Sequence, residues 1–181
     1  MHMYGGGLSV QLKRDCKAIQ IPNGESMTLE QGHEVYITQV LGGMFTVETE
    51  WGYLVRIDGQ DADALGQEIP KERQKPDWSS FGSLEDAAWA QLKTCYDPEI
   101  PVNIVELGLI YQLDVQDKKN IRLEMTLTAP GCGMGEVLKS DIETKLLDIP
   151  GIESVTIDLV FDPAWASEMM SDAARLQLGM I

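Results

Sequence analysis

One stretch of this 181-residue chain constrains its fold more than any other, because it separates two different sequence patterns. Residues 66–82 hold Pro70, Pro76, a cluster of charges and several small polar residues, a composition typical of a linker. Short alternating segments precede this stretch, whereas helical stripes and alternating segments follow it. The chain is long enough for two small domains. We therefore expect a domain at residues 1–65, a linker at 66–82 and a second domain at 83–181.

The first domain is expected to consist of β-strands. Val35 and Ile37 alternate with Tyr36 and Thr38, which is the period of a strand. Four segments are predicted as strands: Lys17–Ile21, Glu34–Gln39, Phe45–Thr49 and Tyr53–Ile57. Several short strands joined by glycine-containing turns predict a small β-barrel-like domain.

The second domain is expected to alternate between helices and strands. Ser83 with Asp86 forms a capping-box pattern, and the helix that it begins should end near Asp97, because the residue before a proline avoids the helical conformation. Further elements are predicted at Leu109–Val115, Ile121–Thr128, Met134–Leu146, Val155–Phe161 and Ser167–Leu178. The order is α-β-β-α-β-α, which predicts a compact domain with a short mixed sheet and helices on one face. The whole chain is thus assigned to the α+β class.

The first group of candidate functional residues lies in the loop Thr128–Gly135, between a predicted strand and a predicted helix. Gly131 and Gly133 allow the backbone to turn tightly and to approach a ligand closely. Cys132 precedes a helix N-terminus, whose positive dipole end favours the thiolate that binds metal or attacks sulfur. The alternative is a buried cysteine used only for packing.

A second group of polar residues lies in the proline-stiffened loop before the next strand. Asp97, Glu99, Asn103 and Glu106 could orient a partner of the thiol or hold a metal transiently. The alternative is that Asp97 and Asn103 cap turns and helix ends, a common use of such residues.

Several familiar catalytic motifs are excluded by spacing. The stretch from Gly133 lacks the glycine–lysine pair of a phosphate loop, and Glu136 occupies the place of the last glycine in a dinucleotide fingerprint. His33-Glu34 has no second histidine at the spacing of a zinc protease, and no pair of cysteines has the spacing of a closed zinc site.

Composition narrows the environment and the partners. A formal net charge of −15 opposes binding to phosphate backbones, so no nucleic-acid partner is expected. No apolar run is long enough for a membrane span, and residues 1–7 do not resemble a signal peptide. Three scattered cysteines make no disulfide framework, which favours a reducing cytoplasm.

Three motifs together resemble a known family. They are Asp97–Tyr111, Thr126–Cys132, and Ile149–Val155 followed by Phe161–Trp165. In this order they resemble the domain shared by SufT proteins, the cytosolic iron–sulfur targeting factors and PaaD. The resemblance covers nearly all of residues 80–180. One departure is Gly133, since many members have proline after the cysteine.

The resemblance implies an accessory factor in iron–sulfur cluster assembly or delivery, not an enzyme. Its reactive thiol would be Cys132, with Asp97, Glu99, Asn103, Glu106, Thr128, Gly131 and Gly133 as binding or orienting residues. Its partners would be iron–sulfur assembly proteins and client apoproteins. Because clusters are normally held by about four cysteines, any cluster or iron on Cys132 would be transient, shared across a homodimer, or absent. The alternatives are a cysteine-dependent thiol transferase and a non-catalytic interaction module.

The two-domain prediction can be tested by limited proteolysis. Cleavage should occur between about Gly66 and Ser83 and leave a C-terminal fragment that is still folded by circular dichroism, because each half has its own apolar pattern. A fragment that unfolds on cleavage would show that the two halves share one core.

Overall fold

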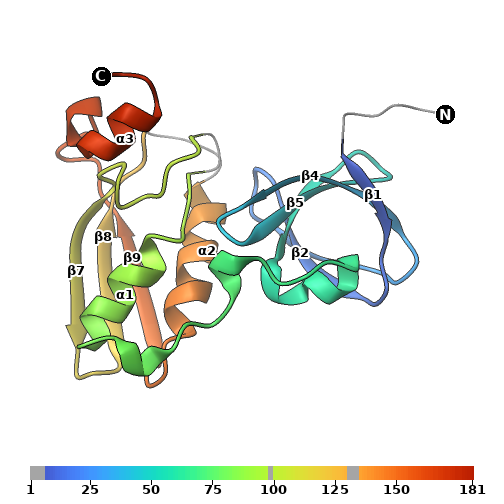
Figure 1. Ribbon diagram of the computed structural model, residues 1–181, viewed down its shortest axis with the longest axis horizontal. Coiled ribbons are helices and arrows are strands. Elements are labelled where there is room, and N and C mark those ends of the chain that lie inside the picture. The colour runs from blue at the N-terminus through green and yellow to red at the C-terminus, as the bar shows by residue number, and fades with distance from the viewer. Residues whose placement is uncertain (1–6, 98–99, 130–134) are drawn as a thin grey trace. The chain divides into compact units, whose positions relative to one another are not determined.

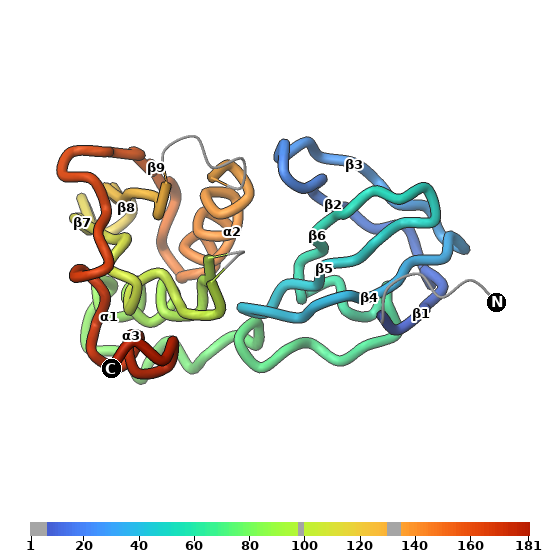
Figure 2. The backbone as a smooth tube through the Cα atoms, turned by 90° about the horizontal axis from the view of Figure 1, so that it is seen from above, coloured from blue at the N-terminus to red at the C-terminus, as the bar shows by residue number. Residues whose placement is uncertain are grey.

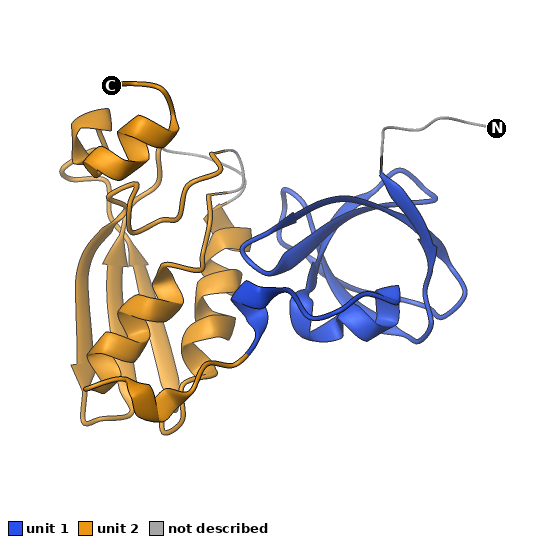
Figure 3. Cartoon of the chain, viewed as in Figure 1, with its two compact units in different colours: residues 1–74 blue, residues 75–181 orange. Residues whose placement is uncertain are grey.

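The computed structural model describes residues 7–97, 100–129 and 135–181. Two compact units make up the chain, Met1–Gln74 and Lys75–Ile181 (Figure 3). Each unit has its own cluster of buried apolar side chains. In the part of the chain that is described, no helix is both long and apolar enough to cross a membrane.

The first unit is a six-stranded antiparallel sheet followed by short 3-10 helices. The strands are β1 (Leu8–Gln11), β2 (Cys16–Gln20), β3 (Ser26–Leu29), β4 (Glu34–Leu41), β5 (Met44–Thr49) and β6 (Leu54–Asp58), in the order β1-β4-β5-β6-β2-β3. The first two 3-10 helices are η1 (Gly59–Leu65) and η2 (Lys71–Arg73). Figure 1 shows that the sheet is strongly curved. In the pairings of the described residues β1 and β3 are edge strands.

Alternation along the central strands builds the core of this unit. Val47 of β5 is paired with Ile37 of β4 and with Val55 of β6, and Val35, Val47 and Val55 are completely buried. Their neighbours in sequence point to the other side of the sheet, as the strand period requires. Strands β1 and β3 were not predicted from the sequence. Both are edge strands of four residues, too short to show clear alternation.

Part of the stretch predicted as a linker packs on the first unit. Arg73 is 4% exposed, and its guanidinium donates two hydrogen bonds to Asp58, from Nε to Oδ1 at 2.7 Å and from Nη2 to Oδ2 at 3.0 Å. The backbone carbonyl of Arg73 also accepts a hydrogen bond from Gln60 Nε2 at 2.5 Å. Such a fork-to-carboxylate pair fixes both distance and orientation, so residues up to Gln74 are held on the first unit.

The second unit has the predicted order of elements. After η3 (Trp78–Ser80) come α1 (Leu84–Leu92), β7 (Ile110–Gln116), β8 (Asn120–Met125), α2 (Gly135–Leu147), β9 (Ser154–Leu159), η4 (Ser167–Met169) and α3 (Asp172–Gln177). The sheet order is β7-β8-β9, with β7 antiparallel and β9 parallel to β8. The predicted mixed sheet is therefore present, beside the larger antiparallel sheet of the first unit.

Helices α1 and α2 cover one face of this small sheet. Helix α1 packs against β7 and α2 against β9, and the helices contact each other (Figures 1 and 2). On β8, Ile121, Leu123 and Met125 point toward the helices and are at most 1% exposed, whereas Arg122 between them is exposed. The parallel β8-α2-β9 connection requires such a crossover helix.

We expect the Arg73 contact to contribute to the stability of the first unit. Arg73→Ala leaves the Asp58 carboxylate without its ion-pair partner and should lower the free energy of unfolding by about 2 kcal/mol, less than for a fully buried pair because Asp58 is partly exposed. Lys71→Ala, an exposed residue of the same short helix, is the control and should have little effect. Hydrogen exchange of β5 and β6 during urea titration reports this unit separately; equal stability of the two variants would contradict the assignment.

Candidate functional site

Three chain segments meet on the side of the small sheet where β7 begins and where β8 and β9 end. We call this row of strand ends the edge of the small sheet. Ile110, at the start of β7, pairs with Met125, at the end of β8. Met125 is also aligned with Leu159, at the end of β9. The loop before β7, the segment after β8 and the segment after β9 therefore leave the sheet at the same edge. Four of the site residues predicted from the sequence are described by the structure, and they lie in the segments at this edge: Asp97, Asn103, Glu106 and Thr128.

The loop that carries Asp97 is closed by backbone contacts. Tyr96 and Asn103 form an antiparallel bridge, and Ile104 N donates to Cys95 O at 2.9 Å. Asp97 is 6% exposed, and its Oδ1 accepts a hydrogen bond from Ile100 N at 3.1 Å. The carboxylate thus holds the turn of its own loop.

Asn103 and Glu106 stabilise the next turn and its packing. Asn103 Oδ1 accepts a hydrogen bond from Glu106 N at 2.9 Å, and Asn103 O accepts one from Leu107 N at 3.0 Å. The Glu106 carboxylate accepts a short hydrogen bond from Ser171 Oγ, and its backbone carbonyl accepts one from Ser171 N at 2.9 Å. Asp97 and Asn103 therefore have the capping contacts that the sequence offered as the alternative, and Glu106 holds the C-terminal segment.

The segment after β9 folds back over the loop before β7. Trp165 Nε1 donates to Leu107 O at 2.8 Å, and Tyr111 Oη donates to Pro163 O at 2.8 Å. Gly108 has φ +77°, and a Cβ there would collide with the backbone of Met169, so only glycine fits this close approach. These contacts were not predicted from the sequence. The only signal for them was the aromatic cluster Phe161–Trp165.

The segment after β8 leads toward Cys132. Thr126 is completely buried, and its N–H donates to Leu109 O at 2.9 Å, which extends the pairing of β7 and β8. Among the described residues its hydroxyl Oγ1 has no hydrogen-bond partner, a costly arrangement for a buried polar atom that the sequence did not suggest. Thr128 follows it and is half-buried.

Helix α2 begins immediately beyond the predicted cysteine loop. Its first residue, Gly135, lies so close to Leu127 that a Cβ would stand 2.9 Å from Leu127 Cδ1. This contact fixes where the helix starts relative to the end of β8. Cys132, Gly131, Gly133 and Glu99 lie outside the described residues.

The two described cysteines are both buried. Cys16 is 3% exposed and Cys95 is 1% exposed. Burial raises the pKa of the Cys16 thiol to about 11, an effect increased by the nearby carboxylate of Asp61. Within the described ranges, His, Cys, Asp and Glu side chains form no group of three or more that could hold a metal.

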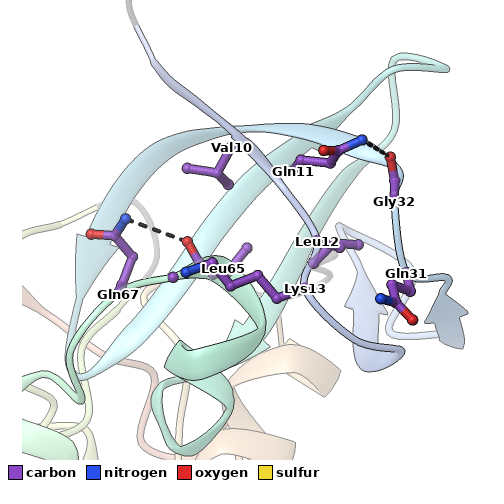
Figure 4. A pocket seen from close by; sticks show the side chains of 9 residues that line it. Val10, Gln11, Leu12, Lys13, Gln31, Gly32, Leu65 and Gln67 are labelled. Carbon is purple, nitrogen blue, oxygen red and sulfur yellow. Dashed lines mark hydrogen bonds between the residues drawn. The ribbon is translucent and has the colours of Figure 1, made fainter.

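The first unit contains a separate open pocket of about 660 Å³ (Figure 4). The amide nitrogens of Gln11 and Gln67 are engaged at its wall, with Gly32 O at 2.9 Å and Leu65 O at 3.4 Å. Lys13 is the only charged side chain among the residues that line it. The pocket therefore offers a single cation and no acid–base pair or nucleophile.

Comparison with known proteins agrees with the architecture of the second unit. The family model described as "Iron-sulfur cluster assembly protein" matches residues 85–159. A solved structure of a domain of unknown function from Bacillus anthracis covers 54% of this chain and 93% of its own length, with 34% identity and a TM-score of 0.50. The domain is thus a small α/β module of this type.

Two relatives extend this likeness. A protein of Porphyromonas gingivalis named Fe-S protein maturation auxiliary factor is 42% identical over 103 residues, 57% of this chain and 98% of the relative. The Fe-S protein maturation auxiliary factor SufT of Staphylococcus aureus is 39% identical over 84 residues, 46% of this chain and 96% of that protein. The chain belongs to the iron–sulfur cluster assembly protein family, and the resemblance inferred from its motifs is confirmed.

Cysteine alkylation should separate Cys132 from the buried thiols. At neutral pH Cys132 should react first. Cys16 should react slowly, with a rate that rises up to about pH 11, because only the thiolate reacts and burial disfavours it. Peptide mass spectrometry of timed samples measures the three rates, and the urea-denatured protein, in which all three should react alike, is the control. Equal, slow labelling of Cys132 and Cys95 in the native protein would indicate a structural role for Cys132.

The Ser171 contact should hold the C-terminal segment on the loop before β7. Ser171→Ala removes the donor to Glu106 and the cap on Ala174 N, so opening of α3 should become easier by about 1–2 kcal/mol. Hydrogen exchange of α3 should accelerate about tenfold or more, while β8 stays unchanged. Ser167→Ala is the matched control, since Ala166, not Ser167, precedes η4 and no side chain caps it. Unchanged exchange of α3 in Ser171→Ala would show that the contact is not needed.

Proposed function

We propose that this protein is an accessory factor in the maturation of iron–sulfur proteins. The observation that carries the proposal is family membership through a relative named as such a factor, aligned over 98% of the relative's length. The role is assistance in assembly or delivery of a cluster to client proteins, without a turnover reaction of its own. The cluster is cargo, not a resident cofactor.

Cys132 is the residue through which we propose that the factor acts. In the sequence Cys132 stands between Thr128, which lies at the edge where three chain segments meet, and Gly135, the first residue of α2. A cysteine next to a helix N-terminus is favoured as thiolate, the form that binds iron or exchanges sulfur ligands. The other two cysteines are buried, and the thiol of Cys16 is held protonated by its surroundings.

Hydrogen bonds hold the loop before β7 in one conformation, which supports a role for this edge in positioning a partner. Asp97, Asn103 and Glu106 are committed to hydrogen bonds of the loop itself and of the C-terminal segment. Their proposed contribution is therefore to position the edge, and Glu99 is the carboxylate that we propose binds the cargo or a client. The proposed partners are iron–sulfur assembly proteins and client apoproteins.

A single thiol favours transfer over storage. Stable clusters usually have about four cysteine ligands, and the described residues provide no further cluster of ligands. Cys132 is therefore proposed as a transient ligand, with the remaining ligands supplied by the donor, the client or a second copy of the chain.

The test is Cys132→Ala in cells that depend on this protein. The variant should accumulate normally, and the activities of iron–sulfur enzymes should fall, most strongly when iron is limiting. Glu99→Gln should give a weaker defect of the same kind. The control is Cys16→Ala, which changes a buried thiol of the first unit and should leave these activities intact if the variant is stable. Full enzyme activity in Cys132→Ala cells under iron limitation would contradict a thiol-based mechanism.

A further inference from the structure

The first unit lies outside residues 85–159, the part matched by the family model, and it presents large apolar side chains at one hairpin. Trp51 is 54% exposed and Tyr53 is 49% exposed, both in the connection between β5 and β6. The next residue, Leu54, is 39% exposed. Large apolar side chains gathered in this way on a surface commonly mark a site of protein interaction.

The hairpin does not need these aromatic side chains for its own structure. Thr49 N donates to Tyr53 O at 2.8 Å, Gly52 N donates to Thr49 O at 2.9 Å, and Thr49 Oγ1 accepts from Tyr53 N at 3.0 Å. Trp51 and Tyr53 are exposed and are not among the buried residues of the unit's core. The turn is thus closed by backbone and threonine contacts, and the two rings remain available to a partner.

The exposed indole contacts an imidazole that two carboxylates flank. The rings of His33 and Trp51 lie 4.7 Å apart between centroids, at 56°. His33 Nδ1 is 2.5 Å from Glu50 Oε1, and His33 Nε2 is 3.7 Å from Glu30 Oε2. We call the set Glu30, His33, Glu50, Trp51 and Tyr53 the aromatic tip.

The aromatic tip has a negative balance of charge. Its two carboxylates face one imidazole, and they raise the pKa of His33 above its ordinary value. The side chain of Glu30 is 76% exposed and that of Glu50 is 43% exposed, so their remaining acceptor positions are open to solvent. Even with His33 protonated, the tip retains one net negative charge beside an exposed indole.

This combination is complementary to arginine. A guanidinium is planar and weakly hydrated, stacks on aromatic rings and donates to carboxylates in a fork geometry. A second copy of this chain is a poorer partner, because its net charge of −15 would be brought against an acidic surface. A nucleic acid is opposed by the same charge.

We propose that the aromatic tip binds an arginine-containing segment of a partner protein, with the guanidinium on the exposed part of Trp51 and its N–H groups donating to Glu30 and Glu50. Tyr53 and Leu54 then contact the apolar residues next to that arginine. The first unit would thus select a partner while the second unit acts on the cargo. The surface is defined by residues of the first unit alone, so it does not depend on the function of Cys132.

The test uses the full-length protein and a defined probe. The probe is an acetylated, amidated peptide with the sequence Leu-Arg-Leu-Arg-Gly, and the comparison peptide carries citrulline in place of both arginines. Titration followed by 15N-HSQC should shift the indole signal of Trp51 and the amides of residues 49–54 with the arginine peptide. The citrulline peptide, which keeps the shape and loses the charge, should bind at least about tenfold more weakly.

Two variants and one control complete the test. Trp51→Ala and Glu50→Gln should each weaken binding of the arginine peptide by about fivefold to tenfold. Glu25→Gln, an exposed carboxylate of the same unit outside the tip, should leave the affinity unchanged. Because Trp51 and Glu50 are exposed, the variants should keep the amide spectrum of the core.

Three outcomes would overturn the proposal. Equal binding of both peptides would remove the role of the guanidinium. Amide shifts spread over acidic regions of both units would show non-specific attraction to an acidic protein. The same conclusion would follow if Glu25→Gln weakened peptide binding as much as Glu50→Gln. Sedimentation that reveals dimers lost in Trp51→Ala would assign the tip to a second copy of the chain. A Cys132→Ala protein that keeps peptide affinity while failing in iron–sulfur maturation would separate this site from the proposed function.

Discussion

The parallel pairing of β8 with β9 is the contact on which the arrangement of the second unit depends. Because both strands run in the same direction, the chain must return from the end of β8 to the start of β9, and α2 makes this return. The segments after β8 and β9 therefore leave the sheet at the same edge. The hairpin between β7 and β8 brings the loop before β7 to that edge as well. One strand pairing thus gathers three loops that are distant in sequence.

Hydrogen bonds to backbone groups then make this edge firm. Asp97, Asn103 and Ser171 each satisfy an N–H of a turn or a helix start, and Trp165 binds a carbonyl of the opposite segment. Buried or half-buried groups of this kind are costly to leave without partners, so they hold the loops in one arrangement.

The two units of the chain carry different candidate functional features. The second unit contains the family domain, and the loop with Cys132 lies in it. The first unit has a curved sheet, an open pocket with one cation and an aromatic tip with exposed carboxylates. Because each unit has its own buried core, the surface of one unit can vary without disturbing the core of the other.

Much of the second unit could be predicted from sequence, because local signals and tertiary packing agree there. The alternation of Ile121, Leu123 and Met125 indicated a strand with one buried face, and Ser83 marked the start of α1, where its side chain does accept from Asp86 N. The family also followed from motifs in order along the chain. The short edge strands β1 and β3 were missed, since four residues carry too little periodicity and their stability comes from pairing with β4 and β2.

For the candidate site, the sequence by itself determined which residue types lie near Cys132 in the chain, and its spacing excluded several catalytic motifs. Only the tertiary structure decided what those residues do. From sequence alone Asp97 and Asn103 could be ligands or caps, and in the folded chain each accepts a hydrogen bond from a nearby N–H group, as a cap does. The contacts of Glu106 with Ser171 and of Arg73 with Asp58 join residues 65 and 15 positions apart. No local pattern encodes such pairs, because the partner of a polar side chain is set by which segments the folded core brings together.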